Sequence, residues 1–497
     1  MSAASGSPVT SSSRRALDHS LVSGVAWTAA ARLGTQVVTS VSLLVLARLL
    51  TPRDFGLMGM AAVLSAAITM LSEFGIDGAV LVSKDLTPAK ISHLHALAIL
   101  LGFGGTLIAC AAAPVAAVLF RTPQLLRIVP AVGIGFCISG FRVVPQSVLL
   151  RTSRFKLVAG VESGQAIAST ATAVALAYLG FSYWSLVLGS LVGTLFTTLT
   201  LSLMYPCRPG KPVWGDLRQE ITFSWQLLVG RLGWYVYSNS DFAVAGRTLG
   251  GSILGLYTMA WNIASLPVEK VSGLVTRVTP SVLLQVRDHP AELRRYIRGV
   301  TETLALVTFP IAFGLSVVSR PLVQALFDHR WWPVAGPLCL LAACASVRCI
   351  VSLMPQVLNV LGDTAAPMWN TLAIALVLPA SFWYASRWGA VGIAATWLCV
   401  YPLLTIPLLF RMLFKTGMSA GEYFSALLPA SVGCVVMATV VLLEQHWMGT
   451  GLAAWLRLAV EVMTGAVCYC GIILLFFRSR AELLLRTVLR RKAALAI

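Results

Sequence analysis

Apolar segments long enough to cross a lipid bilayer follow one another along almost the whole chain. Hydrophobic residues make up 57% of the 497 residues and charged residues only 11%, whereas a soluble domain carries about 25% charged residues. A span needs about 20 mostly apolar residues, and its backbone must form its hydrogen bonds internally, so each segment is expected to be a helix. The sequence predicts an all-α polytopic membrane protein with about fourteen transmembrane helices, over residues 20–48, 55–82, 91–119, 125–150, 156–179, 182–204, 221–246, 252–280, 297–319, 333–360, 365–386, 389–413, 424–444 and 453–477.

Basic residues between these segments predict the orientation of the chain. With the N-terminus in the cytoplasm, 22 of the 37 Lys and Arg residues fall on the inner side, 9 on the outer side and 6 within helices. Inner loops carry the basic excess in membrane proteins, so both termini are predicted to be cytoplasmic. The predicted parts are a polar flexible tail (1–18), an N-lobe (19–205), a cytoplasmic linker (206–220), a C-lobe (221–415), two further helices (416–478) and a basic cytoplasmic tail (479–497).

An internal repeat gives both halves of the chain the same intramembrane cation. A shift of 199 residues aligns Arg32 with Arg231, and it also aligns Gly56 with Gly255. Six helices map onto six in the same order and direction, because an even number of helices separates them. Repeats of this kind are related by an axis along the membrane normal. We therefore expect two six-helix lobes in a pseudo-twofold arrangement, with the last two helices outside the repeat.

Several cations within the predicted helices are candidates for substrate binding. A charge at membrane depth costs about 3 kcal/mol or more, so it is seldom kept without a role. A guanidinium group can hold a phosphate through two hydrogen bonds at once, which predicts a phosphate or pyrophosphate site. The candidates are Arg32 and Arg231 near the midpoints of their helices, Arg142 and Arg348 toward the cytoplasmic half of theirs, and Lys270.

Four acidic residues of the predicted helices are candidates for coupling or pairing: Glu73, Asp77, Asp241 and Glu162. An acid in low-dielectric surroundings can change its protonation between two conformations, which suits proton or cation coupling. The alternative is structural ion pairing, of Arg32 with Glu73 or Glu162 and of Arg231 with Asp241. The sequence leaves both alternatives open.

Motifs of enzymes and of metal or nucleotide sites are absent from the sequence. It contains no GxxxxGK[ST] and no HExxH, and none of its cysteine spacings matches a metal site. We therefore predict no catalytic residue, no metal site and no cofactor. The net charge of +18 is interpreted as loop charge that fixes topology, rather than as a nucleic-acid surface.

Short stretches beside the first helices resemble a known family. They are Ala-Arg-Leu-Leu-Thr-Pro-Arg-Asp-Phe-Gly-Leu at 47–57, Phe-Gly-Ile-Asp-Gly-Ala at 74–79, Lys-Asp-Leu-Thr at 84–87 and Arg-Thr-Ser-Arg-Phe-Lys at 151–156. With this order of helices the chain resembles the polysaccharide transporter family, the Wzx-type flippases of lipid-linked oligosaccharides. That family belongs to the MOP superfamily, together with the peptidoglycan-precursor flippase MurJ and the MATE multidrug exporters.

The resemblance implies a V-shaped pair of lobes around a cationic cavity, with Arg32 and Arg231 at cavity positions by helix and depth. It implies a bacterial inner-membrane flippase whose substrate is undecaprenyl-pyrophosphate bearing an exopolysaccharide, capsule or O-antigen repeat unit. Membrane lipids, a polysaccharide polymerase and export machinery are the partners it implies. The last two helices would form a groove for the polyprenyl tail.

Two other functions are weighed against this one. A cation-coupled multidrug exporter of the same superfamily would share the fold, but six intramembrane bases would repel cationic cargo. A membrane glycosyltransferase or polysaccharide polymerase would need a sizeable outer loop with acidic or histidine residues, and the outer loops here are short.

Overall fold

The computed structural model describes residues 34–73, 76–82, 87–152, 154–210, 214–448 and 453–476. It describes the side chains in these ranges except those of residues 73, 79, 81–82, 155, 214–232, 266–272, 274–278 and 281. Helices make up nearly all of this described part, and it contains no strand. The predicted all-helical membrane fold is confirmed. The predicted tails 1–18 and 479–497 lie outside the described residues.

The helices up to α7, which we call the N-lobe helices, follow the predicted segments closely. They are Gly34–Leu49, α2 (Pro52–Glu73), α3 (Ile76–Val82), α4 (Pro88–Leu119), α5 (Leu125–Arg151), α6 (Phe155–Tyr178) and α7 (Trp184–Met204). The second predicted helix, 55–82, covers α2 and α3, with residues 74–75 between them outside the described part.

The helices from α8 to α14, which we call the C-lobe helices, contain more breaks. They are α8 (Trp214–Val286), α9 (Pro290–Val317), α10 (Ser319–Leu326), the 3-10 turn η1 (His329–Val334), α11 (Ala335–Val351), α12 (Leu353–Val360), α13 (Ala365–Ala385), the 3-10 turn η2 (Ser386–Trp388) and α14 (Gly389–Thr416). Two further helices follow, α15 (Ala420–Trp447) and α16 (Ala454–Phe476). Helix α8 begins inside the predicted linker 206–220.

Helix α8 joins the predicted seventh and eighth helices, and Gly250 separates its two halves. Gly250 has φ 81° and ψ 176°, a conformation that only glycine adopts readily, so the helix is interrupted there. Among the described residues, nine helices are long and apolar enough to cross a membrane. The count of fourteen spans stays a prediction.

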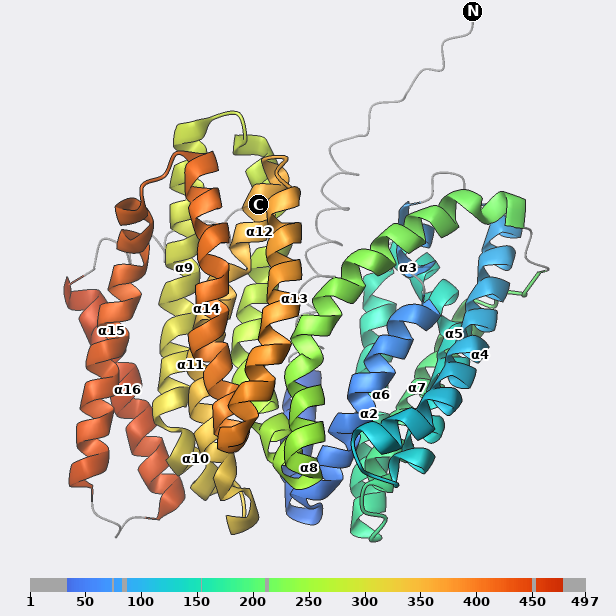
Figure 1. Cartoon of the computed structure of the whole chain (residues 1–497), viewed down its shortest axis with the longest axis horizontal. Helices are drawn as coiled ribbons and strands as arrows, with labels where there is room; N and C mark the ends of the chain where they lie inside the picture. Colours follow the sequence, from blue (N-terminus) through green and yellow to red (C-terminus); the bar gives the residue numbers. More distant parts are fainter. Residues whose placement is uncertain are drawn as a thin grey trace, which may run out of the picture.

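The N-lobe and C-lobe helices come together at one end of the molecule and diverge at the other, except that the first half of α8 crosses to α3 and α4 on the N-lobe side (Figure 1). The main contact between them is that of α2 with α8. Helix α15 packs on α9 and α16 packs on α15, so these two helices extend the C-lobe side away from the N-lobe (Figure 1). The two lobes are therefore joined mainly through the α2–α8 contact.

Reciprocal glycine contacts bring the lobes together at the α2–α8 contact. A Cβ atom at Gly56 would lie 1.7 Å from the carbonyl oxygen of Gly251, and one at Gly255 would lie 1.7 Å from the carbonyl oxygen of Pro52. The 199-residue repeat pairs Gly56 with Gly255 and Pro52 with Gly251, so the two contacts are the same contact seen from either half. Local twofold symmetry at this contact is what reciprocal pairing requires.

The stretch that carries the family resemblance builds the start of α2 at this contact. The backbone N–H and the hydroxyl of Thr51 donate to the Asp54 carboxylate at 2.8 and 2.7 Å, while the Thr51 hydroxyl accepts from the Asp54 N–H at 3.3 Å. This is a capping box, and Pro52 occupies the first helical position, where no N–H is needed. Ser182, in the turn before α7, also donates to Asp54, which is buried. The motif thus fixes the residue at which α2 begins, and with it the face of α2 on which Gly56 meets α8.

Aromatic side chains cover the contact from both lobes. The Trp331 indole N–H donates to the Ala47 carbonyl at 2.8 Å, and its ring meets Phe55 edge-on at a centroid distance of 5.3 Å. Phe120 rests on Gly246, where a Cβ atom would lie 2.8 Å from the Phe120 ring. The repeat pairs Ala47 with Gly246, so each half covers the equivalent position of the other with an aromatic ring.

Candidate functional site

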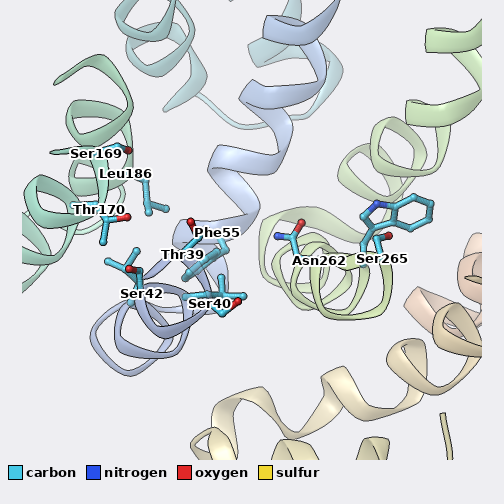
Figure 2. A pocket seen from close by; sticks show the side chains of 13 residues that line it. Thr39, Ser40, Ser42, Phe55, Ser169, Thr170, Leu186, Asn262 and Ser265 are labelled. Atoms are coloured by element: carbon cyan, nitrogen blue, oxygen red, sulfur yellow. The ribbon is translucent and has the colours of Figure 1, made fainter. Parts of the chain in front are cut away.

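A cavity of about 390 Å³ lies between the lobes, beside the α2–α8 contact. Helix Gly34–Leu49, α2, α6 and α7 line it from the N-lobe, and α8 lines it from the C-lobe (Figure 2). Its lining residues are Thr39, Ser40, Ser42, Leu43, Leu46, Phe55, Ser169, Thr170, Ala173, Leu186, Trp261, Asn262 and Ser265. Because both lobes contribute walls, any relative movement of the lobes would change its shape.

Hydroxyl and amide groups dominate the polar part of this lining. Thr39 and Ser169 belong to polar rows that the sequence shows at helical spacing along the first and fifth predicted helices. Asn262 extends from α8 toward the N-lobe side, opposite Thr39 and Thr170 (Figure 2). Sequence reasoning missed Asn262 and Ser265, although their spacing of three residues on one helix face within an apolar segment was a usable signal.

A buried carboxylate lies inside the C-lobe. Asp241 is fully buried; its Oδ2 accepts from the Tyr257 hydroxyl at 2.7 Å and from the Trp397 indole N–H at 2.9 Å. Its Oδ1 accepts from the backbone N–H of Phe242 at 2.9 Å. Three donors thus replace the water that a carboxylate would otherwise require. They hold the helix that carries Asp241 to the second half of α8 and to α14.

Arg348 packs against the same cluster. Its guanidinium carbon lies 4.5 Å from the ring centroid of Trp261 and 5.4 Å from that of Trp397, within cation–π range. The two indole rings are 5.4 Å apart, and the indole of Trp397 also donates to Asp241. Arg348 is therefore held by aromatic faces next to a carboxylate, a setting that the sequence pattern did not reveal.

The other predicted site residues are distributed over both lobes. Arg142 on α5 donates to Gln146, one turn further on, at 2.6 Å. Asp77 is half-buried on α3, and Glu162 is exposed on α6. None of these three, and neither Asp241 nor Arg348, is among the residues that line the cavity.

The four remaining predicted site residues have no described side chain. Arg32 lies outside the described residues, and the side chains of Arg231, Glu73 and Lys270 are not described. Their roles stay predictions, as do those of Arg142, Arg348, Asp77, Asp241 and Glu162. In the described part of the chain, no group of three or more His, Cys, Asp or Glu side chains is arranged to hold a metal ion.

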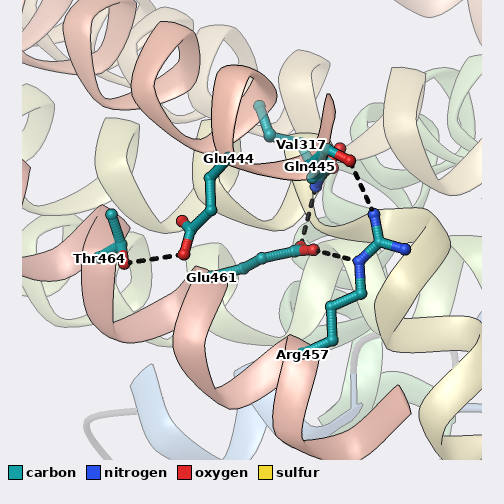
Figure 3. Close-up of polar contacts among 6 residues, drawn as sticks. All are labelled: Val317, Glu444, Gln445, Arg457, Glu461 and Thr464. Atoms are coloured by element: carbon teal, nitrogen blue, oxygen red, sulfur yellow. Dashed lines mark hydrogen bonds and ion pairs between the residues drawn. The ribbon is translucent and has the colours of Figure 1, made fainter. Parts of the chain in front are cut away.

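A second polar cluster joins α15 to α16 and was not predicted. The fully buried Glu461 accepts from Arg457 Nε at 2.9 Å and from the Gln445 amide at 2.9 Å (Figure 3). Gln445 also donates to the Val317 carbonyl at the end of α9 at 3.3 Å, and Glu444 accepts from Thr464. The cluster fixes the α15–α16 pair to α9. A glutamate four residues after an arginine in an apolar helix was the available signal.

An apolar groove of about 580 Å³ runs beside this cluster between α9, α15 and α16. Its walls include Leu306, Ile311, Val441, Val462 and Ala466, and Glu461 lies at its margin. The walls of the groove are almost entirely apolar, which suits a hydrocarbon chain rather than a sugar or a phosphate.

Comparison with known proteins gives a consistent result. A family model described as "Polysaccharide biosynthesis protein" matches residues 45–336. The chain is 25% identical over 489 residues to the teichuronic acid biosynthesis protein TuaB of Bacillus subtilis, covering 94% of this chain and 98% of TuaB. It is 26% identical over 488 residues to the succinoglycan biosynthesis transport protein ExoT of Rhizobium meliloti, covering 94% and 95%. It is 24% identical over 427 residues to the lipopolysaccharide biosynthesis protein WzxC of Escherichia coli, covering 83% and 85%.

Solved structures with the same fold come from two transporter groups. The chain matches the lipid II flippase MurJ in an inward closed conformation with a TM-score of 0.75 at 14% identity, covering 91% of this chain and 99% of MurJ. It matches an inward-facing multidrug resistance MATE transporter of the MOP superfamily with a TM-score of 0.56 at 15% identity, covering 78% and 96%. These similarities establish the fold.

Proposed function

Because the chain belongs to the family of polysaccharide biosynthesis proteins, we propose that it moves undecaprenyl-pyrophosphate-linked repeat units of an exopolysaccharide, capsule or O-antigen from the cytoplasmic to the periplasmic leaflet. It is a multi-pass membrane protein and a transporter rather than an enzyme, a flippase for lipid-linked polysaccharide. The observation that carries the finer proposal is the cavity walled by both lobes and bounded at one end by the α2–α8 contact.

The proposed mechanism is alternating access. With both termini in the cytoplasm, as the loop charges predict, the α2–α8 contact lies on the outer side of a bacterial inner membrane and the diverging ends of the lobes face the cytoplasm. In this state the substrate head would enter from the cytoplasm. Rocking of the lobes about their interface would then separate Gly56 from Gly251 and open the cavity to the periplasm.

The intramembrane cations are proposed to receive the pyrophosphate. Arg32 and Arg231, one in each half, supply the symmetric pair, and Arg142, Arg348 and Lys270 supply further positive charge. Glu73, Asp77, Asp241 and Glu162 remain the candidates for ion coupling or ion pairing. Asp241 and Arg348 both contact the indole of Trp397, which supports a structural role for these two.

The polyprenyl tail is proposed to stay in the lipid phase during transport. The apolar groove beside α15 and α16 is suited to such a tail, because its walls are mostly aliphatic side chains. A polysaccharide polymerase and export machinery would receive the repeat units on the outer side.

The experiment that tests the proposal is transport in liposomes. Purified protein is reconstituted with defined lipid-linked glycans, and the fraction of glycan exposed on the opposite leaflet is measured with and without a pH or sodium gradient. Transbilayer movement above that of empty liposomes is expected. In cells, Arg32→Ala and Arg231→Ala are each expected to abolish export at normal protein level; normal polymer in both variants would contradict the pyrophosphate assignment.

A further inference from the structure

Among the residues that the structure describes, those that line the cavity between the lobes carry no charge. None of the thirteen residues that line it is Lys, Arg, Asp or Glu. Arg348 is not in the lining: its guanidinium carbon lies 4.5 Å from the ring centroid of Trp261, on the C-lobe side among aromatic rings. An ion placed in this cavity would lose hydration without gaining a counter-charge from its described walls, which is costly.

Several polar groups of the cavity have hydrogen-bonding capacity to spare. In the described part of the chain, the side chains of Ser169, Thr170 and Asn262 form no hydrogen bond. The Thr39 and Ser42 hydroxyls donate to carbonyls of their own helix, so their oxygen lone pairs remain as acceptors. Donors and acceptors are thus interspersed over a surface without charge, which is the complement of a polyol.

The size and position of the cavity restrict its occupant further. A volume of about 390 Å³ is near the lower end of small-molecule sites, and suits a short piece of glycan rather than a polymer. Phe55, Leu43 and Leu46 supply apolar surface for the C–H faces of a sugar ring. Because Asn262 faces Thr170 from the opposite lobe, separation of the lobes would divide the polar partners (Figure 2).

We infer that this cavity is a subsite for an uncharged sugar of the transported glycan, an inference that rests on the proposed function. The sugar occupies the end of the central space next to the α2–α8 contact, while the pyrophosphate stays with the cations elsewhere. The described walls offer no counter-charge to a uronic acid or other acidic sugar, so desolvation disfavours such a sugar at this position. When the lobes separate, the sugar loses its partners on one side and is released.

Binding measurements on the purified full-length protein test the subsite. The probes are undecaprenyl-pyrophosphate alone, the same lipid bearing one glucose, and the same lipid bearing one glucuronic acid. The wild type is expected to bind the glucosyl lipid more tightly than the other two. Asn262→Ala should weaken binding of the glucosyl lipid about 3- to 10-fold, as expected for one or two lost hydrogen bonds, and leave the bare lipid unchanged.

A charge-adding variant gives the test a second, opposite outcome. Asn262→Lys should raise the affinity for the glucuronyl lipid and lower that for the glucosyl lipid, because it supplies the missing counter-charge. Asn359→Ala and Asn359→Lys, at an exposed position on α12 outside the cavity, are the matched controls and should change nothing. Equal affinity of the wild type for glucosyl and glucuronyl lipids, or an equal loss for all three probes in Asn262→Ala, would overturn the subsite.

The flipping assay separates this inference from the proposed function. If the wild type binds the glucosyl lipid selectively but moves no lipid-linked glycan across liposomes, the transport proposal fails and the sugar subsite stands. If the wild type flips lipid-linked glycans but Asn262 variants do not alter their selectivity, the subsite fails and the transport proposal stands.

Discussion

Replacing Gly56 by alanine is the sharpest test of how the lobes close. In the structure the α-carbon of Gly56 faces the backbone of Gly251 so closely that an added Cβ atom would lie 1.7 Å from the Gly251 carbonyl oxygen and 2.5 Å from its carbonyl carbon. Both obstructing atoms are backbone, so no side-chain rotation can make room. The clash must be relieved by movement of α2 relative to α8.

The size of the required movement follows from the same distances. Cβ contacts shorter than 3.0 Å are essentially not found in proteins, so the backbones must separate by about 1.3 Å, the difference between 3.0 and 1.7 Å. Overpacking of this kind costs about 1–3 kcal/mol. At roughly 1.4 kcal/mol for each factor of ten, the balance between the closed and open states of this end should shift about 5- to 150-fold toward the open state.

Double electron–electron resonance between spin labels on the two lobes measures this shift. Labels at exposed positions 127 and 320, in a background without native cysteines, report the separation of the lobes near the contact. Gly56→Ala should enrich the longer distance, and Gly255→Ala should do the same, because the two contacts are reciprocal. The double variant should add little, since either clash alone already separates the same pair of helices.

The control is Gly104→Ala on α4, where a Cβ atom would meet nothing within 4 Å. This variant carries the same chemical change without the clash and should keep the wild-type distance distribution. Unchanged distances in Gly56→Ala, with normal transport, would refute the conclusion that this glycine contact sets the closed state.

Three smaller predictions follow from other contacts. Trp331→Phe keeps an aromatic ring but removes the hydrogen bond of 2.8 Å from the indole N–H to the Ala47 carbonyl, which should weaken closure of the lobes by about 1 kcal/mol. Chemical labelling of a cysteine introduced beside the α2–α8 contact should therefore rise. Glu461→Gln should lower the melting temperature in detergent through the loss of about 1–3 kcal/mol, less than for a fully buried pair because its arginine partner is 25% exposed. The control Glu422→Gln, at a half-buried position in the first turn of α15 that forms no ion pair with the described residues, should not lower it. The Arg411 guanidinium donates to Asp363 and lowers the pKa of that carboxyl. The contact therefore stabilises the fold at pH values above the ordinary carboxyl pKa, and this stabilisation is lost as the pH falls through the lowered pKa. The small difference in melting temperature between the wild type and Asp363→Asn should therefore be present at pH 7, begin to fall below about pH 4 and vanish only below the lowered pKa of Asp363.

The helices could be predicted well because the bilayer imposes a length and an apolar composition on each of them. The break between the seventh and eighth helices was also predictable, since Gly250 and Gly251 interrupt one long apolar stretch. The divided tenth helix was not, because hydropathy is the same on both sides of Ser352. The register of α2 against α8 was likewise hidden, since a repeated glycine does not reveal which backbone it faces.

The candidate site was predicted less completely, for a physical reason. Charges stand out in an apolar sequence, so reasoning from sequence concentrated on arginines. Serine and threonine do not stand out, because in helices their hydroxyls commonly bond to carbonyls of the preceding turn, as Thr39 and Ser42 do. Which of these hydroxyls meet across the lobes depends on helix packing. Arg348 illustrates the converse, since its aromatic surroundings come from two helices other than its own, α8 and α14.

The repeat constrains the two halves differently at the axis and away from it. At the α2–α8 contact each half is the other's partner, so a small residue is needed at the same position twice, and both Gly56 and Gly255 satisfy this. Away from the axis no such reciprocity holds: the 199-residue shift pairs Ser42, which lines the cavity, with Asp241, which is buried among aromatic side chains. A glycan is itself asymmetric and requires different groups on its two sides. Substitutions at the axis should therefore alter the balance between conformations, whereas substitutions at Ser42 should alter which glycan is carried.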